Sequence, residues 1–269
     1  MPELPEVETT RRGIEPWLAG HVIERIIVRQ PKLRWPVDDA IQSLQGEKIL
    51  SLSRRAKYIL VETARGTAIW HLGMSGSLRL VEADVPPGKH DHIDWLMSNG
   101  KVLRYHDTRR FGALLFVPPG QVSEHLTHLG PEPLSDEFTP DYLYQRTRGK
   151  SQAIKTFIMD GKVVVGVGNI YANESLFKAG IRPQAAAGKL TKPRCERLVE
   201  EIRDVLAKAI AQGGTTLRDF VGGDGKPGYF AQQLLVYGRG GEDCKVCKTP
   251  LKELRQGQRA TVYCPACQR

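Results

Sequence analysis

Four of the five cysteines lie close together near the end of the sequence, in a spacing that suits a metal ion. Cys244 and Cys247 form one C-x2-C pair, and Cys264 and Cys267 form a second pair sixteen residues later. Four thiolates fill the coordination shell of one tetrahedral ion, so we expect one structural Zn²⁺ with no open position for catalysis. Two disulfides are the alternative, and they are disfavoured because no secretory signal is visible at the N-terminus.

The first residues of the chain could supply a nucleophile and an acid. Removal of Met1 would expose Pro2, whose secondary amine, as an N-terminal group, titrates at about pH 8 and is partly unprotonated at neutral pH. Such an amine can form a Schiff base with a sugar aldehyde carbon, and the adjacent Glu3 can act as a general acid or base. The alternative is a proline that only begins a helix, and composition alone favours this alternative.

These groups need a rigid frame, and the first half of the chain predicts antiparallel strands. A short helix is expected over residues 2–18, and short runs with a period of two follow from residue 21 to residue 117. Asn99 and Gly100 separate two such runs, and this pair accepts the positive φ angles of a two-residue hairpin turn. Many short strands at close spacing predict a β-sandwich or a barrel.

After a candidate linker at residues 130–133, the hydrophobic period becomes helical. Helices are expected over residues 142–148, 153–159, 170–179 and 193–211. Cys195 lies in the last of these and is interpreted as an incidental thiol. Gly166 and Gly168 precede Asn169, the expected N-cap of the third helix. Glycines before a helix N-terminus allow a phosphate to approach backbone N–H groups, although a plain helix–helix corner explains the same pattern.

The overall charge permits a polyanionic partner without requiring one. The 269 residues carry 39 basic and 30 acidic side chains, for a formal charge of +9. Residues 236–269 hold seven basic and three acidic side chains, the densest positive charge in the chain. The near-average composition excludes a disordered tail, a collagen-like fibre and a low-complexity chain. No apolar stretch approaches the roughly 18 residues of a membrane span, so we expect a cytoplasmic protein with no membrane partner.

Eight motifs, in one order along essentially the whole chain, resemble those of the bacterial formamidopyrimidine-DNA glycosylases. The first is the opening sequence at residues 1–8, and the others lie at residues 54–58, 71–76, 107–112, 129–134, 166–172, 224–230 and 258–261. Each motif is modestly specific, whereas the ordered set is highly specific. The resemblance implies an enzyme that removes 8-oxoguanine and formamidopyrimidines from damaged double-stranded DNA and then cleaves the abasic site by β,δ-elimination.

The resemblance also implies roles for individual residues. Pro2 would attack C1′ of the damaged nucleotide, Glu3 would donate and shuttle protons, and Lys57 would assist β-elimination. Arg259, in the zinc finger, would bind phosphate and assist δ-elimination. Further phosphate contacts would come from His71, His90, Lys150 and Asn169.

The resemblance assigns Met74, Arg109 and Phe111 to the hole that the extruded nucleotide leaves in the duplex. Apolar wedges and an arginine can offset the stacking that is lost when a base is flipped out. Core packing is the alternative for Met74 and Phe111, but the flanking glycines favour exposed loops. The loop at residues 215–230 would close over the flipped base.

The expected fold is α+β and multidomain, with an N-terminal helix, an antiparallel β-sandwich, a helix-two-turn-helix domain and a four-cysteine zinc ribbon. The expected domains are residues 1–130 (catalytic β-sandwich), 131–149 (linker), 150–235 (helical, DNA-binding) and 236–269 (zinc finger). We expect a monomer without a nucleotide cofactor that works at the nucleoid in the bacterial cytoplasm.

Two other functions stay open at this point. A sister enzyme of the same fold, resembling endonuclease VIII, removes oxidised pyrimidines, but the opening Leu4-Pro5 and the set Met74, Arg109 and Phe111 favour the purine enzyme. A non-catalytic DNA-binding zinc protein is the second alternative, and the intact Pro2, Glu3 and Lys57 argue against it.

Overall fold

The computed structural model describes residues 2–214 and 233–269, which fall into two compact units. The N-terminal unit comprises residues 2–127 together with residues 212–214, and the C-terminal unit comprises residues 128–211 and 233–269. The predicted lesion-closing loop at residues 215–230 lies outside the described residues. No helix in the described part of the chain is both long and apolar enough to cross a bilayer.

The N-terminal unit is built on two four-stranded antiparallel sheets, with the strand orders β1-β6-β7-β5 and β2-β3-β4-β8. The strands are β1 (Ile23–Val28), β2 (Ile49–Arg55), β3 (Tyr58–Thr63), β4 (Gly66–His71), β5 (Ser77–Glu82), β6 (Asp91–Met97), β7 (Lys101–His106) and β8 (Ala113–Val117). Their apolar faces share one core, in which the buried rings of Trp70 on β4 and Trp95 on β6 lie 5.6 Å apart between centroids. The predicted β-sandwich is therefore confirmed.

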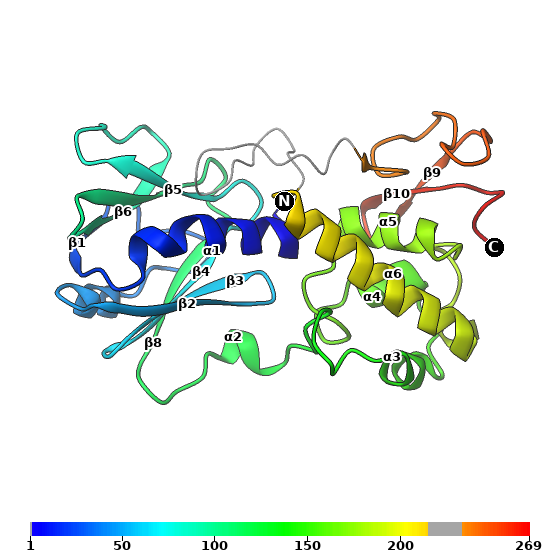
Figure 1. Ribbon diagram of the computed structural model, residues 1–269, viewed down its shortest axis with the longest axis horizontal. Coiled ribbons are helices and arrows are strands. Elements are labelled where there is room, and N and C mark those ends of the chain that lie inside the picture. Colours follow the sequence, from blue (N-terminus) through cyan, green and yellow to red (C-terminus); the bar gives the residue numbers. More distant parts are fainter. Residues whose placement is uncertain (1, 215–232) are drawn as a thin grey trace. The chain divides into compact units, whose positions relative to one another are not determined.

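Helix α1 (Leu4–Leu18) covers an open side of this sandwich. It packs against β2 and β3 of one sheet and β5 of the other, and Figure 1 shows it lying along the sheets. Its apolar residues recur at helical spacing, so that Val7, Ile14 and Leu18 all enter the core. Two short helices, η1 (Asp39–Leu44) and α2 (Glu124–Thr127), complete the N-terminal unit.

The hairpin between β6 and β7 forms where it was predicted, but its turn has a different geometry. Leu96 pairs with Val102, and three residues, Ser98 to Gly100, form the loop. Gly100 has a φ of +81°, whereas Asn99 is not among the residues with positive φ. The prediction of a two-residue turn was therefore wrong. A three-residue loop needs only one left-handed position, and the Asn99 side chain instead accepts a hydrogen bond from the Lys101 backbone N–H at 3.1 Å.

The C-terminal unit combines helices with a small two-stranded ribbon. Its elements are α3 (Pro140–Thr147), α4 (Ile154–Ile158), α5 (Asn169–Lys178), η2 (Ala187–Lys189), α6 (Lys192–Ala211), β9 (Lys252–Gln256) and β10 (Arg259–Tyr263). The long α6 packs against both α3 and α5, and α5 also packs against β10 (Figure 1). The helical and zinc-ribbon parts of the predicted fold are thus present, while the predicted domain boundaries stay a prediction.

Candidate active site and nucleic-acid interface

The two residues predicted to start the chemistry lie buried at the beginning of α1. Glu3 is the N-cap of the helix and is only 2% exposed, and Pro2 immediately before it is also buried. The Glu3 backbone N–H donates to Oε2 of Glu6 at 2.8 Å, which belongs to a capping box. A carboxyl group at a helix N-terminus experiences the positive end of the macrodipole. The local fold therefore holds the nucleophile candidate and the acid candidate in one fixed arrangement.

Lys57 lies at the tip of the hairpin between β2 and β3, which is tied to the same helix. Arg55 pairs with Tyr58, so Ala56 and Lys57 alone form the turn, and Ala56 has a φ of +53°. Arg54 donates to the Ala56 carbonyl at 2.9 Å and to the Glu8 carboxylate on α1 at 3.1 Å. The helix that begins at Glu3 and the turn that carries Lys57 are therefore joined through one arginine.

The Glu8 carboxylate stays charged in this network. Burial by itself raises the pKa of Glu8, but hydrogen bonds from Arg11 and Arg12 and the nearby charge of Arg54 outweigh burial, so the pKa lies below its ordinary value. Glu8 accepts from Arg11 at 3.0 Å and from Arg12 at 2.7 Å. A buried carboxylate with several cationic partners can hold a charged arginine in place next to the Lys57 turn.

His71 lies at the end of β4, opposite Tyr58 in the strand register, and the charge of Lys57 acts on its imidazole ring. Burial and the positive charges of Arg34 and Lys57 lower the pKa of His71 to about 4, against the raising effect of Asp107. Its Nδ1 accepts a hydrogen bond from the Gly73 backbone N–H at 3.1 Å. The ring is therefore neutral at physiological pH and carries its proton on Nε2, which can donate to a phosphate oxygen.

We expect this neutral histidine to make the folded state less stable in acid. The unfolded chain protonates His71 at its ordinary pKa of 6.5 and the folded chain only at about 4, so the unfolded state binds more protons between these values. Stability should therefore be complete above pH 6.5 and fall toward pH 4, by at most roughly 3 kcal/mol from this residue. Urea unfolding of the wild type and of His71→Asn across this range tests the expectation, which fails if both lose stability equally.

Met74, Arg109 and Phe111 lie on two neighbouring loops of the N-terminal unit. Phe111 is 49% exposed, Arg109 is exposed and Met74 is half-buried, so core packing does not account for these side chains. The loops touch closely: a Cβ atom on Gly73 would lie 2.4 Å from the Gly112 backbone nitrogen. Only glycine allows this approach. The glycines that predicted exposed loops therefore also let the two loops pack closely against each other.

A buried carboxylate that the sequence analysis did not single out organises both loops. Asp107 is fully buried, and its side chain accepts hydrogen bonds from the Ser75 hydroxyl at 2.6 Å, the Tyr105 hydroxyl at 2.8 Å and the Gly112 N–H at 2.9 Å. The Arg109 N–H also donates to it, at 3.2 Å. One carboxylate thus sets the positions of the Met74 loop and the Arg109–Phe111 loop.

The backbone of Asp107 brings a third predicted contact to the same place. Its N–H donates to the carbonyl of His90 at 3.0 Å, and its own carbonyl is bonded to Nε2 of His92 at 2.7 Å. His90 lies within a tight turn in which the Asp91 carboxylate accepts from the Gly88 N–H at 2.7 Å. The predicted contacts His90, Met74, Arg109 and Phe111 therefore share one buried anchor.

Replacing Asp107 with alanine should leave four donors without their acceptor and lower the free energy of unfolding by about 2–5 kcal/mol. Asp84→Ala, at an exposed position, is the matched control and should change stability little. Thermal or urea unfolding of the two variants measures the difference. Equal stabilities for Asp107→Ala and Asp84→Ala would show that the buried carboxylate does not anchor the loops.

In the C-terminal unit, Asn169 and Arg259 are brought together by their neighbours. Asn169 is the first residue of α5, and its Nδ2 donates to the carbonyl of Ala260, next to Arg259, at 3.1 Å. The prediction that Asn169 is the N-cap was wrong, because Gly168 takes that position with an extended backbone. The amide keeps a second N–H for a phosphate, at the positive end of α5. Arg259 is exposed at the start of β10.

Two polar residues that sequence reasoning missed support this arrangement. Lys155 is fully buried in α4, and its Nζ donates to the Ala260 carbonyl at 3.0 Å and to Oγ1 of Thr261 at 2.6 Å. Asn173 on α5 accepts from the Val262 N–H at 2.8 Å. A charged residue inside the apolar run of α4 was the available signal. Glu174 on α5 is a further buried charged residue of this kind. Its carboxylate accepts hydrogen bonds from the backbone N–H groups of residues 235–237.

Lys150 stands apart from these groups. It is exposed between α3 and α4, and its carbonyl accepts from the Gly188 N–H at 2.8 Å. Within the described residues, no hydrogen bond or ion pair joins it to Asn169 or Arg259. Its role as a phosphate contact therefore stays a prediction from the family resemblance, and its charge and exposure are compatible with that role.

The four predicted metal ligands converge at the base of the β9–β10 ribbon. Their Sγ atoms all lie within 4.8 Å of one another, with Cys247 and Cys264 3.4 Å apart and Cys244 and Cys267 4.0 Å apart. These cysteines are free, so the disulfide alternative is excluded. Thiolates around a tetrahedral zinc ion lie about 3.8 Å apart, given Zn–S bonds of about 2.3 Å. The donor set therefore fits one closed, structural Zn²⁺ site.

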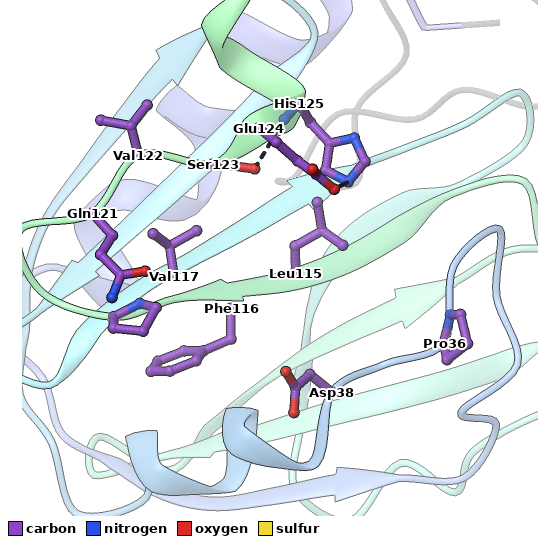
Figure 2. Close-up of a pocket in the computed structure, with 11 residues that line it drawn as sticks. Pro36, Asp38, Leu115, Phe116, Val117, Gln121, Val122, Ser123, Glu124 and His125 are labelled. Carbon is purple, nitrogen blue, oxygen red and sulfur yellow. Dashed lines mark hydrogen bonds and ion pairs between the residues drawn. The ribbon is translucent and has the colours of Figure 1, made fainter.

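A cavity of about 300 Å³ beside β8 does not contain these groups. Figure 2 shows it bordered on one side by Pro36 and Asp38 and on the other by the segment from Gln121 to His125. Its charged lining includes the carboxylates of Asp38 and Glu124, which repel a phosphate backbone. The candidate site is therefore the set of buried anchors and exposed side chains described above, not this cavity.

Three family models match the chain. Residues 1–114 match the formamidopyrimidine-DNA glycosylase N-terminal domain, residues 129–221 match the formamidopyrimidine-DNA glycosylase H2TH domain, and residues 241–269 match the zinc finger found in FPG and IleRS. Together these models span most of the sequence in the order of the predicted motifs.

Whole-length relatives and solved structures agree with these matches. The formamidopyrimidine-DNA glycosylase of Teredinibacter turnerae is 61% identical over 271 residues, with both chains fully covered. The wild-type Lactococcus lactis Fpg (MutM), solved with DNA that contains N7-benzyl-Fapy-dG, is 33% identical with a TM-score of 0.93 and full coverage of both chains. MutM (FPG) from Thermus thermophilus is 36% identical with a TM-score of 0.89, covering 99% of this chain and 98% of that one.

Proposed function

The chain belongs to the formamidopyrimidine-DNA glycosylase family, and from that premise we propose how its own residues carry out the reaction. The protein is a base excision repair enzyme for oxidised purines, and it is both a glycosylase and an AP lyase. The observation that carries the residue assignment is the burial of Pro2 and Glu3 together at the start of α1, where a nucleophile and an acid lie side by side.

The first step is attack by the secondary amine of Pro2, after removal of Met1, on C1′ of the damaged nucleotide. The N–C1′ bond forms as the bond from C1′ to the base breaks, and the base leaves with the electron pair. Glu3 supplies the proton that neutralises the charge developing on the leaving group or the sugar oxygen. The Pro2 nitrogen then loses its N–H proton, the C1′–O4′ bond breaks with its electron pair going to O4′, and Glu3 delivers the proton that O4′ takes up. The product is an iminium linking Pro2 to the opened sugar.

The iminium then allows both elimination steps. It acidifies the C2′ proton, whose removal expels the 3′ phosphate, and a second elimination expels the 5′ phosphate. Lys57 and the neutral Nε2–H of His71, which lie together in the N-terminal unit, bind and orient the phosphate near the scissile bond. Arg259 and Asn169 bind phosphate from the zinc ribbon and from α5, and Lys155 positions Arg259 through Ala260.

The exposed loops of the N-terminal unit hold the duplex while the base is outside it. Met74 and Phe111 occupy the gap in the stack, and Arg109 faces the partner base left unpaired. His90 and Lys150 contribute further phosphate contacts. Zn²⁺, held by Cys244, Cys247, Cys264 and Cys267, supplies folding energy to the ribbon that carries Arg259 and no catalytic chemistry.

The partner is damaged double-stranded DNA. The solved relatives from Lactococcus lactis hold DNA with Fapy-dG or an abasic site, which supports this assignment. The protein acts as a monomer, needs no nucleotide cofactor and works at the nucleoid in the bacterial cytoplasm. Light scattering of the protein with and without a lesion duplex tests the monomer.

A panel of lesions tests the substrate assignment. Excision of 8-oxoguanine opposite cytosine should be much faster than excision of thymine glycol in the same sequence context, and borohydride should trap a covalent complex with the 8-oxoguanine duplex. A clear preference for thymine glycol would indicate the endonuclease VIII type of enzyme. Excision of neither lesion, with DNA binding intact, would indicate a non-catalytic DNA-binding protein.

A further inference from the structure

A cavity of about 530 Å³ in the C-terminal unit is lined by four cationic side chains, those of Arg182, Lys189, Arg194 and Arg269. They come from the segment after α5, from η2, from the first turn of α6 and from the position two residues after Cys267. None of the other lining side chains is acidic. The cavity therefore gathers positive charge from parts of the chain that are distant in sequence.

Two of the three arginines are held in place by main-chain oxygens. Nε of Arg182 donates to the Gln268 carbonyl at 3.0 Å, and its Nη2 donates to the Pro265 carbonyl at 3.3 Å. Arg194 donates through Nη2 to the main-chain oxygen of Arg269. A guanidinium carries five N–H donors, so each keeps donors for a ligand while little side-chain entropy remains to be lost on binding.

These four cations differ from other cations of the same unit. Lys178, Lys192 and Lys208 each form an ion pair with a nearby carboxylate. Within the described residues, no Asp or Glu side chain pairs with Arg182, Lys189, Arg194 or Arg269, and the contact of Arg194 is to the main-chain oxygen of Arg269. Like charges around one cavity repel each other, and an anion between them removes that cost. Arg194 also lies in the first turn of α6, a 20-residue helix whose N-terminal end carries partial positive charge.

We propose that this cavity binds a phosphate group, and that its source is the DNA backbone several nucleotides away from the lesion. This rests on the proposed function. The turn at η2 is bonded to the predicted DNA contact Lys150 through the Gly188 N–H at 2.8 Å, so the cavity continues the positive surface there. The ten residues of α5, about 15 Å of helix, separate Asn169 from the segment that leads to Arg182, so a phosphate in the cavity differs from one held at Asn169.

The length of the duplex distinguishes this contact from those at the lesion. Binding is measured for two duplexes that carry a stable abasic-site analogue at their centre, one of about 9 and one of about 25 base pairs, since the short one ends about 15 Å from the lesion. The double variant Lys189→Ala with Arg194→Ala should bind the long duplex about tenfold more weakly and lower its salt slope by about one to two. Its affinity for the short duplex and its excision of 8-oxoguanine should equal those of the wild type.

Arg197→Ala is the matched control, because Arg197 is an exposed cation on the same helix that does not line the cavity. Because it removes one charge and the double variant removes two, it should lower the logarithm of the affinity for the long duplex by less than half as much as the double variant does. A loss of half or more would mean that only the general charge matters, and would overturn the proposal. Excision of 8-oxoguanine by the wild type is assayed in parallel, so that failure of the proposed function is seen separately.

A titration with inorganic phosphate distinguishes the DNA backbone from free phosphate as the source of the bound group. NMR signals of the arginine Nε–H groups are followed as phosphate is added to the wild type and to the double variant. Shifts only in the wild type, together with the dependence on duplex length, support the proposal. Phosphate binding without dependence on duplex length would overturn DNA as the source and assign the cavity to a free phosphate. The absence of both effects would overturn the site altogether.

Discussion

Replacing Glu3 with glutamine should lower the rate of 8-oxoguanine release by roughly 10²–10⁴-fold, the contribution typical of a positioned general acid. Glutamine preserves the size of the side chain and can still accept at the start of α1, but it cannot donate the proton that the departing base requires. An abasic site has already lost its base, so Schiff-base formation with that substrate should fall far less. Single-turnover excision and borohydride trapping on the two substrates measure this difference.

Glu15→Gln is the matched control for this variant. Glu15 lies on the same helix, where it forms an ion pair with Arg11 at 2.6 Å, and its side chain is 38% exposed. The control should leave both activities near those of the wild type. If Glu3→Gln lowered activity on the damaged base and on the abasic site by the same factor, Glu3 would be required for the attack of Pro2 and not specifically for base departure.

Replacing Cys244 with alanine should remove the zinc ion and unfold the ribbon that carries Arg259. Cys244 is fully buried in a small apolar cluster with Val236, Leu251 and Val262, which is too small to fold without help. Structural zinc supplies an apparent free energy of about 10–16 kcal/mol to such segments. Loss of the Arg259 phosphate contact alone should weaken DNA binding by about 10–100-fold. Metal analysis and binding to a lesion duplex measure the two effects.

Cys195→Ala separates metal loss from the loss of a thiol. Cys195 is also fully buried, but it lies on α6 and outside the cluster of four sulfur atoms. This variant should keep one zinc ion per chain and full DNA affinity. A Cys244→Ala protein that retained both would contradict a structural role for the metal.

The parts of the fold that could be predicted are those with a local cause. The spacing of Cys244, Cys247, Cys264 and Cys267 predicts one cluster because only one metal geometry suits it, and the structure brings the four sulfur atoms together. The alternation of apolar residues predicts the sandwich for a similar reason. The turn at Asn99 and Gly100 was predicted with the wrong length, because the register of the strands, and not the dipeptide alone, determines the loop.

The parts that could not be predicted depend on contacts between distant residues. Asp107 is one acidic residue among thirty, and its value to the site arises only when Ser75, Tyr105 and Gly112 meet around it. Lys155 reaches the zinc ribbon across 105 positions of the chain. Neither partner set follows from spacing or period. A charged residue inside an apolar run, such as Lys155 in α4, is the one sequence signal that indicates such an anchor.

The amine of Pro2 is the proposed nucleophile. Its most direct test is borohydride trapping on an 8-oxoguanine duplex, followed by protease digestion and mass spectrometry of the adduct. We predict that the opened sugar is attached to an N-terminal peptide that begins at Pro2, with Met1 absent. An adduct on Lys57, or no adduct from protein whose N-terminal mass shows that Met1 has been removed, would contradict the account.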